Sequence, residues 1–267
     1  MLRVLVLTGG HPFDRPSFTD MLDALPDVWW EEVAHPEAQA RLAPGRVGAD
    51  VVLAYDLPGV TFRPGQPPLL PAPSPELVAG MEGLLDEGQP FVFLHHALAS
   101  WPAWPEFAEI VGGRYHYAPA TLRGQEWPDS GYRHDVHQTL RVVAPDHPVC
   151  AGLPESFELT DETYLCPVFD DDVVPLVVSD APRTDQDHWS TTLALAGRRY
   201  EREGWQHPPG SPLAAWVKRS RRSPVAYVQP GDGPAAFGNA AFRQLLGNAL
   251  HWAASDEARL WGAQVTA

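Results

Sequence analysis

The sequence contains few cysteines and no long hydrophobic run. Among its 267 residues, Cys150 and Cys166 are the only cysteines, which are too few for a disulfide framework and lack the CxxC spacing of a metal site. We expect both to be buried small apolar residues. No stretch approaches the roughly 20 uninterrupted apolar residues that a bilayer-spanning helix needs. The sequence therefore predicts a soluble chain.

Positive charge is also scarce. The chain has 19 lysine and arginine residues against 34 aspartate and glutamate residues, and its formal net charge is -15. This excess repels phosphate backbones and anionic membrane surfaces, so neither nucleic acid nor a membrane is expected as a partner. Met1 leads directly into the run RVLVLTGG, without a basic region and a small-residue cleavage site. We therefore expect a cytoplasmic protein.

The apolar residues are sufficient for a substantial core, because 44% of the chain is hydrophobic. Strand-like and helix-like segments alternate, which predicts an α/β fold with a mostly parallel central sheet and helices on both faces. The proline-rich residues 57–75 are expected to form a surface loop without regular structure. The main expected strands are residues 3–8, 28–33, 50–55, 91–94, 138–144, 157–168, 173–178 and 224–229, and the expected helices are residues 17–25, 75–87, 104–111 and 237–254.

Residues 90–115 organise the rest of the chain. The continuous apolar run 91–94 is typical of a central strand whose two faces are both covered. His95 and His96 follow at its carboxyl end, where open α/β sheets bind their ligands. We expect this pair to line a site. The alternative is that one imidazole packs inward and hydrogen-bonds a backbone carbonyl.

Other candidates come from neighbouring strand ends. Gly9 and Gly10 end the first strand sharply, and such a turn lets a ligand approach backbone N–H groups. His11 and Asp14 follow this turn, and Asp56 ends the third strand at the same edge. All three side chains are therefore candidates for ligand binding.

Trp101 and Trp104 flank the start of the helix expected after the imidazole pair. Their aromatic faces suit stacking on a sugar or another ring. Core or lid packing is an equally frequent role for tryptophan at a helix start.

Residues 114–157 and 181–210 are polar and proline-rich, and we expect them to be insertions or long loops over the sheet edge. The first would bring His134 and His137, together with Glu162 beyond it, onto the imidazole pair. One wall of the site would then come from each half of the chain.

Two features of the second half carry separate predictions. Asp161 and Glu162 are adjacent in a strand-like run, so at most one enters a given pocket while the other is solvated or pairs elsewhere. The dipeptide His147–Pro148 is expected to be a structural turn.

The sequence contains, in this order, the segments VLVLTGGHPFDRPSF, FVFLHHALASWPAWPEFAEIVGGRY, DHPVCAGLPESFELTDETY and FGNAAFRQLLGNALHWA. Together they resemble the ThuA-like (trehalose utilisation) family. The resemblance implies a single domain over residues 1–267 with a fold like that of class I glutamine amidotransferases, which is a flavodoxin-like arrangement. Amidotransferases carry a nucleophilic cysteine at the elbow that here reads LHHA, so glutaminase activity is not expected. The family's GHD turn reads VAYVQPGDG here, which retains an acidic residue as Asp232 but not the imidazole.

The resemblance also implies a role in carbohydrate metabolism, with a disaccharide or keto-sugar as the small-molecule ligand. As an enzyme, the protein would use His95 or His96 as general acid or base, His134 or His137 as a second imidazole, and Glu162 as the carboxylate. These groups suit proton abstraction next to a carbonyl, or elimination and hydration of a keto-sugar. The alternative is a non-catalytic sugar-binding or partner-binding module.

A divalent metal such as zinc is compatible with these residue types, and His96, His134 and Glu162 are the candidate ligands. The spacing contains no HExxH motif. The sequence leaves open a homo-oligomer. Candidates for substrate binding are His11, Asp14, Asp56, Trp101, Trp104, His137, Tyr164 and Asp232.

Overall fold

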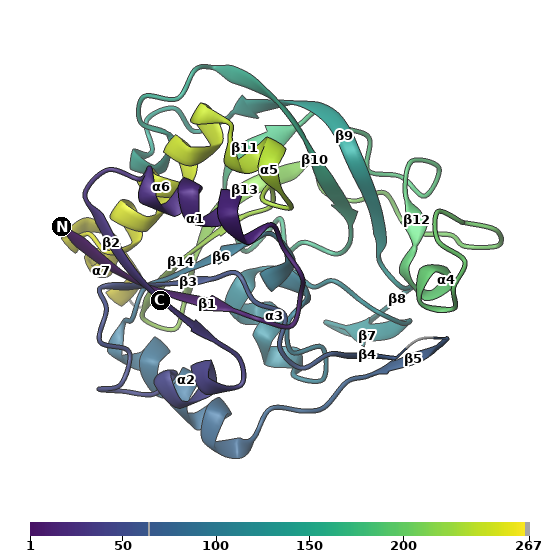
Figure 1. The fold of residues 1–267 in the computed structure, drawn as a ribbon, viewed down its shortest axis with the longest axis horizontal. Helices are drawn as coiled ribbons and strands as arrows, with labels where there is room; N and C mark the ends of the chain where they lie inside the picture. The colour runs from purple at the N-terminus through teal and green to yellow at the C-terminus, as the bar shows by residue number, and fades with distance from the viewer. Residues whose placement is uncertain (64, 265–267) are drawn as a thin grey trace.

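A large twisted sheet with helices on both faces forms the centre of the molecule (Figure 1). The computed structural model describes residues 1–63 and 65–264. Nine strands of the ten-stranded sheet lie in the order β10-β9-β11-β13-β14-β6-β3-β1-β2, and β12 pairs with β9 in addition. No helix in these residues is long and apolar enough to cross a bilayer.

One half of the sheet is parallel. It consists of β2 (Val28–Ala34), β1 (Leu2–Thr8), β3 (Val51–Ala54), β6 (Phe91–Leu94) and β14 (Ser223–Val228). In chain order this is the 2-1-3-4-5 arrangement of flavodoxin-like folds. Strands β3 and β6 are buried along their whole length, as their continuous apolar runs predict. The predicted α/β fold is confirmed.

The other half is antiparallel. Its strands are β13 (Leu213–Ser220), β11 (Val174–Ser179), β9 (Gly131–Val142) and β10 (Ser156–Leu165), with β12 (Trp189–Ser190) at the side of β9. The prediction of long loops over 114–157 and 181–210 is therefore wrong at residues 131–137 of β9 and at β12, whereas the strand expected at 138–144 is the second part of β9. None of residues 133–137 in β9 is buried, so this part of the strand has the polar sequence that is typical of a loop.

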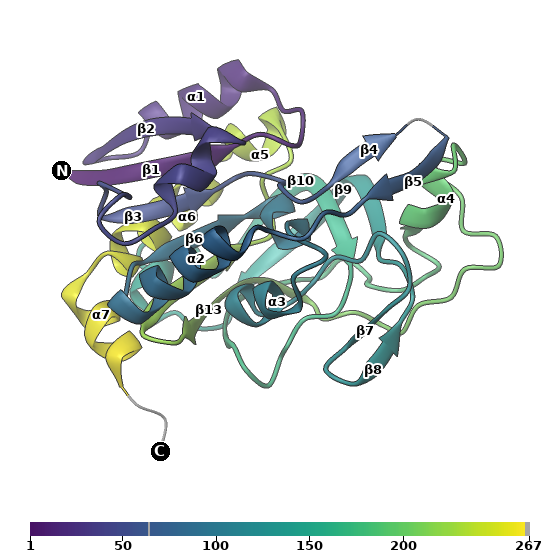
Figure 2. The same cartoon turned by 90° about the horizontal axis from the view of Figure 1, so that it is seen from below.

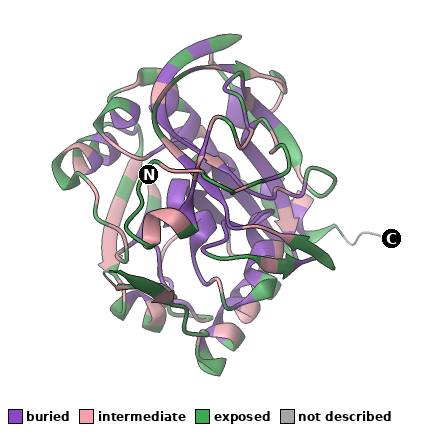
Figure 3. Ribbon diagram, turned by 90° about the vertical axis from the view of Figure 1, so that its right-hand side faces the viewer, coloured by how far each residue is buried: buried purple, intermediate pink, exposed green. Residues whose placement is uncertain are grey.

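Helices cover the parallel half on both faces (Figure 2). Val4 and Val6 of β1 pack into one core with α1, α5, α6 and α7, whereas Leu5 and Leu7 pack into the opposite core with α2 and α3. Figure 3 shows the buried inner strands surrounded by exposed residues. The α-helices are α1 (Arg15–Asp23), α2 (Pro75–Glu87), α3 (Pro105–Val111), α4 (Thr191–Leu195), α5 (Pro234–Phe237), α6 (Ala240–Ala253) and α7 (Asp256–Ala263), and the 3-10 helices are η1 (Glu37–Arg41), η2 (His95–Ala99) and η3 (Pro148–Cys150).

Two predicted segments differ from the structure. The expected helix 237–254 is divided, because the side chain of Asn239 accepts a hydrogen bond from the Phe242 N–H and starts α6 afresh. Residues 57–75 contain the hairpin of β4 (Thr61–Arg63) and β5 (Gln66–Leu69). A two-stranded hairpin tolerates proline, because each strand needs backbone partners on one side alone. A second hairpin joins β7 (Ala120–Leu122) to β8 (Gln125–Trp127).

Candidate functional site

A cavity of about 690 Å³ opens at the carboxyl edge of the parallel strands. Strand β10 runs in the same direction as β6 and β14, so its end reaches this edge as well. Both halves of the chain line the cavity: His11 and His96 come from the first half, and His134, Glu162 and Tyr164 from the second. The predicted convergence of the two walls is confirmed.

The elbow after β6 holds His95 in a strained conformation. Its φ is +50°, a left-handed value that costs a non-glycine residue about 1–2 kcal/mol. Such strain is concentrated at functional sites. The ring is completely buried, and its Nδ1 lies 2.7 Å from the backbone oxygen of Gln229. A carbonyl oxygen can accept but not donate, so Nδ1 carries a hydrogen and Nε2 faces the cluster described next.

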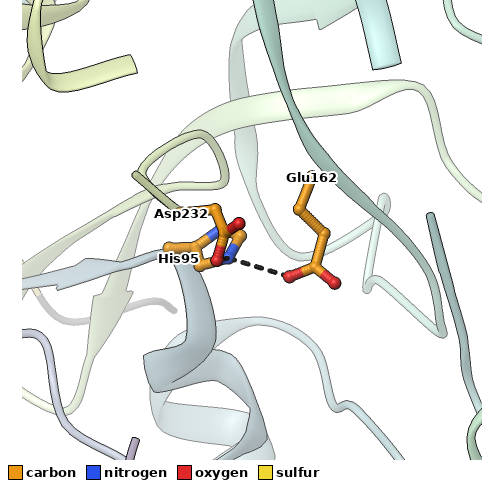
Figure 4. Close-up of side chains that lie close together, drawn as sticks. All are labelled: His95, Glu162 and Asp232. Carbon is orange, nitrogen blue, oxygen red and sulfur yellow. Dashed lines mark hydrogen bonds and ion pairs between the residues drawn. The ribbon is translucent and has the colours of Figure 1, made fainter. Parts of the chain in front are cut away.

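Three oxygen atoms surround Nε2 of His95. The Tyr164 hydroxyl lies at 2.8 Å, Glu162 Oε2 at 3.1 Å and Asp232 Oδ1 at 3.5 Å. In Figure 4 the carboxylate of Asp232 lies against the imidazole, and Glu162 faces both from β10. Burial lowers the pKa of His95, but the hydrogen bonds to Asp232 and Glu162 and the charge of Glu162 outweigh it and hold this pKa well above its usual value.

A β-bulge lies beside the two adjacent carboxylates, Asp161 and Glu162. The register between β9 and β10 shifts between Asp161 and Thr163, and both Asp161 and Glu162 are buried. Glu162 enters the cavity, where its Oε1 lies 3.2 Å from Nδ1 of His134. Asp161 instead accepts hydrogen bonds from backbone N–H groups, as the alternation of a strand predicts for one of the pair.

Asp161 fixes the turn after β14. Its carboxylate accepts hydrogen bonds from the N–H groups of Gly231 at 2.6 Å and Asp232 at 3.2 Å. Gly231 has a φ of +137°, and a Cβ there would lie 3.0 Å from a side-chain carbon of Leu94. Burial raises the pKa of Asp161 to about 6, against the lowering effects of His95 and of the backbone donors. The turn therefore presents Asp232 to His95 in a constrained position.

His96 is the second imidazole of the elbow. It is 3% exposed, and its ring lies 4.4 Å from that of His11 and 4.3 Å from that of Tyr55. Neither ring nitrogen has a hydrogen-bond partner in residues 1–63 and 65–264. Burial and the nearby His11 and His95 hold the pKa of His96 well below its usual value. A neutral ring with two unused nitrogens therefore lines the cavity.

Tyrosines form much of the remaining wall. Tyr115 is buried and Tyr164 is partly buried. Desolvation raises the pKa of both hydroxyls well above the usual value, so they stay protonated hydrogen-bond donors. The tyrosines that line the cavity are Tyr115, Tyr117, Tyr132, Tyr164 and Tyr200. Sequence reasoning identified Tyr164 alone among them, although Tyr115 ends the segment FVFLHHALASWPAWPEFAEIVGGRY that carries part of the family resemblance.

Several predicted binding residues lie outside this cavity. Asp14 is exposed, and its side chain caps α1 by accepting hydrogen bonds from the N–H and hydroxyl groups of Ser17. His137 is exposed on β9, where its Nδ1 lies 3.3 Å from the Thr160 hydroxyl. Asp56 Oδ2 lies 2.6 Å from Nε2 of His35, a residue that sequence analysis missed.

The two tryptophans pack rather than line the cavity. Trp101 and Trp104 are 7% and 5% exposed, and the guanidinium of Arg114 donates hydrogen bonds to both of their backbone oxygens. Trp101 lies with Asp56 beside a separate void of about 20 Å³, which has room for about one water molecule. Packing was the alternative for these side chains, and it is the one observed.

The Gly9–Gly10 turn is filled by the chain itself. A Cβ on Gly10 would lie 2.2 Å from the backbone oxygen of Leu57, and the Leu57 N–H donates to the oxygen of Gly9. Glycine is therefore needed here for contact with the segment after β3 rather than for approach of a ligand.

The predicted metal ligands are only partly brought together. His134 and Glu162 are in contact, but the group with metal-ligand geometry consists of His95, Glu162 and Asp232. The His96 ring packs against His11 and Tyr55, and it lies 5.6 Å from the His95 ring without joining this group. The sequence could not distinguish the two adjacent imidazoles, because their directions depend on the left-handed backbone at His95.

The two cysteines are free and buried, as expected. Burial raises the pKa of Cys150 to about 11 and that of Cys166 to about 12. Both thiols therefore stay protonated near neutral pH, and neither is at the elbow, where His95 stands.

Comparisons with known proteins agree with this architecture. The family model for ThuA, described as trehalose utilisation, matches residues 72–253. A structure described as a ThuA-like protein from Parabacteroides merdae has a TM-score of 0.62 and 15% identity, over 95% of this chain and 90% of its own. A structure described as a ThuA-like protein from Bacteroides uniformis has a TM-score of 0.61 and 16% identity, over 96% of this chain and 92% of its own.

A cytoplasmic protein from Salmonella typhimurium has a TM-score of 0.56 at 10% identity, over 94% of this chain and 99% of its own. At these identities the likeness establishes the fold alone. No curated protein is significantly similar in sequence.

Proposed function

Because this chain belongs to the ThuA (trehalose utilisation) family, we propose that it is an enzyme of carbohydrate metabolism that performs proton transfer on a disaccharide or keto-sugar. The single observation that carries the proposal is the meeting of three imidazoles and a carboxylate at one cavity. His96, His134 and Glu162 line it, and His95 lies 3.1 Å from Glu162. Such groups suit proton abstraction next to a carbonyl, or elimination and hydration.

His96 is the group proposed to exchange a proton with the ligand. Its ring nitrogens have no partner among the described residues, and a neutral imidazole can accept a proton directly. Glu162 joins His95 to His134, so the three are proposed to act as the second proton-transfer group. His95 is buried in contact with Glu162, which is a buried residue of the cavity lining, whereas the His134 side chain in the same lining is 42% exposed.

The wall of tyrosines supports a sugar as the ligand. Aromatic rings pack on the apolar faces of sugars, and protonated hydroxyl groups exchange hydrogen bonds with sugar hydroxyls. The cavity of about 690 Å³ lies within the usual range for small-molecule sites. We expect a small-molecule partner, neither nucleic acid nor a membrane, and a cytoplasmic location like that of the Salmonella typhimurium protein of the same fold.

The test uses the keto derivative of trehalose in D₂O. Proton abstraction next to the carbonyl exchanges that hydrogen for deuterium, which NMR detects together with any product. His96→Asn should slow the exchange by at least about a hundredfold. His251→Asn is the matched control, because His251 is an exposed residue of α6. Saturable binding of the ligand, with neither exchange nor product, would favour a non-catalytic sugar-binding module and refute the enzyme.

A further inference from the structure

His95, Glu162 and Asp232 have the geometry of a metal site. One ligand atom from each lies within 4.8 Å of the other two. Nε2 of His95 is 3.1 Å from Glu162 Oε2 and 3.5 Å from Asp232 Oδ1. Ligands of a tetrahedral zinc ion with bonds of about 2.1 Å are about 3.4 Å apart. From this agreement we infer that these three side chains bind a divalent transition-metal ion of the zinc type, a site that goes beyond the proposed proton transfer.

The imidazole is held ready for this role. Metal-binding histidines commonly donate the second ring N–H to a backbone carbonyl, which fixes the tautomer and the ring direction. His95 makes this contact from Nδ1 to Gln229. The Nε2 atom then faces the two carboxylates, from where it would bind an ion between them. The Tyr164 hydroxyl lies 2.8 Å from Nε2, and an ion bound to Nε2 would replace this hydrogen bond.

Hydrogen bonds to residues beyond the three ligands also orient the carboxylates. Asp161 accepts a hydrogen bond from the Asp232 N–H, and the side-chain amide of Gln229 donates to the backbone oxygen of Glu162 at 2.8 Å. His134 contacts Oε1 of Glu162, which leaves Oε2 for the ion. Outer contacts of this kind are a regular feature of metal sites.

A second observation points to a ligand at the same place. His96 is 3% exposed and is one of the residues that line the cavity that Glu162 enters, and its two ring nitrogens are buried without a partner within the described part of the chain. Three protein ligands beside an open cavity are typical of a catalytic ion rather than a structural one. Bound there, the ion would polarise a ligand oxygen. His95 and Glu162 would then serve as ligands, and His96 and His134 would remain for proton transfer.

The experiment measures metal binding to the full chain without any sugar. Protein treated with a chelator is titrated with Zn²⁺ by calorimetry, with Mg²⁺ as comparison, and Co²⁺ loading is followed by visible absorption. We expect one saturable Zn²⁺ site per chain. Glu162→Gln and Asp232→Asn should each weaken it by more than about tenfold, whereas Glu158→Gln, an exposed carboxylate on the same strand, should leave it unchanged.

Circular dichroism of each variant checks that it is folded. Absence of a saturable site in the folded wild type would overturn the inference, as would equal affinity in the wild type, Glu162→Gln and Asp232→Asn. Because no sugar is present, metal binding without turnover of a keto-sugar refutes the proposed function alone. Turnover by protein that binds no ion refutes the metal site alone.

Discussion

His188 makes the stability of this protein depend on pH, and a substitution at this one residue can measure its contribution. It is 1% exposed, with Nε2 3.2 Å from the Thr163 hydroxyl and Nδ1 3.1 Å from the backbone oxygen of Thr184. The neutral ring satisfies both contacts by donating from Nδ1 and accepting at Nε2. Burial, together with the charge of Arg183, lowers the pKa of His188 from 6.5 to about 4.

The direction in which stability changes with pH follows from when each state binds a proton at His188. Below pH 6.5 the unfolded chain protonates this histidine, whereas the folded chain keeps it neutral until about pH 4. Stability from a neutral His188 is therefore complete above pH 6.5 and is lost as the pH falls toward 4. One pKa unit corresponds to about 1.4 kcal/mol, so the loss amounts to about 3 kcal/mol in the free energy of unfolding.

His188→Gln removes this titration. The glutamine amide can retain a donor and an acceptor, so we expect a cost of about 1–3 kcal/mol at pH 7 from imperfect hydrogen bonds. Between pH 7 and pH 4 the advantage of the wild type should shrink by about 3 kcal/mol. Urea unfolding followed by tryptophan fluorescence at several pH values measures this difference, with His251→Gln as an exposed control. A difference between wild type and His188→Gln that is constant across the pH range would refute the reasoning.

Three other outcomes follow from the site. Gly231→Ala should destabilise the protein by about 1–3 kcal/mol, because its φ of +137° and the 3.0 Å contact leave no room for a Cβ; thermal unfolding measures this, and an unchanged melting temperature would contradict it. Ligand binding, measured by calorimetry, should tolerate His147→Asn much better than Glu162→Gln, because His147 caps η3 by accepting from the Val149 N–H whereas Glu162 lines the cavity; equal loss in the two folded variants would reverse this assignment. Glutamine should release no ammonia in a coupled assay, because the elbow has His95 in place of a thiolate; release that Cys166→Ser abolishes would show that the elbow is misassigned.

The parallel half of the fold could be predicted because its strands are buried on both faces. Runs such as Phe91–Leu94 and Val51–Ala54 have no polar position that a loop would show. Strand β9 could not be recognised over its full length, since one of its faces is largely exposed and carries residues such as His134 and Asp135. Its identity as a strand depends on pairing with β10 and β11, and no local pattern encodes that pairing.

The sequence by itself determined that His95 and His96 stand at the carboxyl end of a buried strand, because strand ends follow from local apolar runs and breakers. Tertiary structure alone decided what each imidazole does. The left-handed backbone at His95 and the bulge of β9 opposite Glu162 direct Glu162 onto His95, across 67 residues of sequence. They leave His96 without a partner among the described residues. Contacts between such distant segments depend on how the strands pack, and the order of residues along one strand does not contain that information.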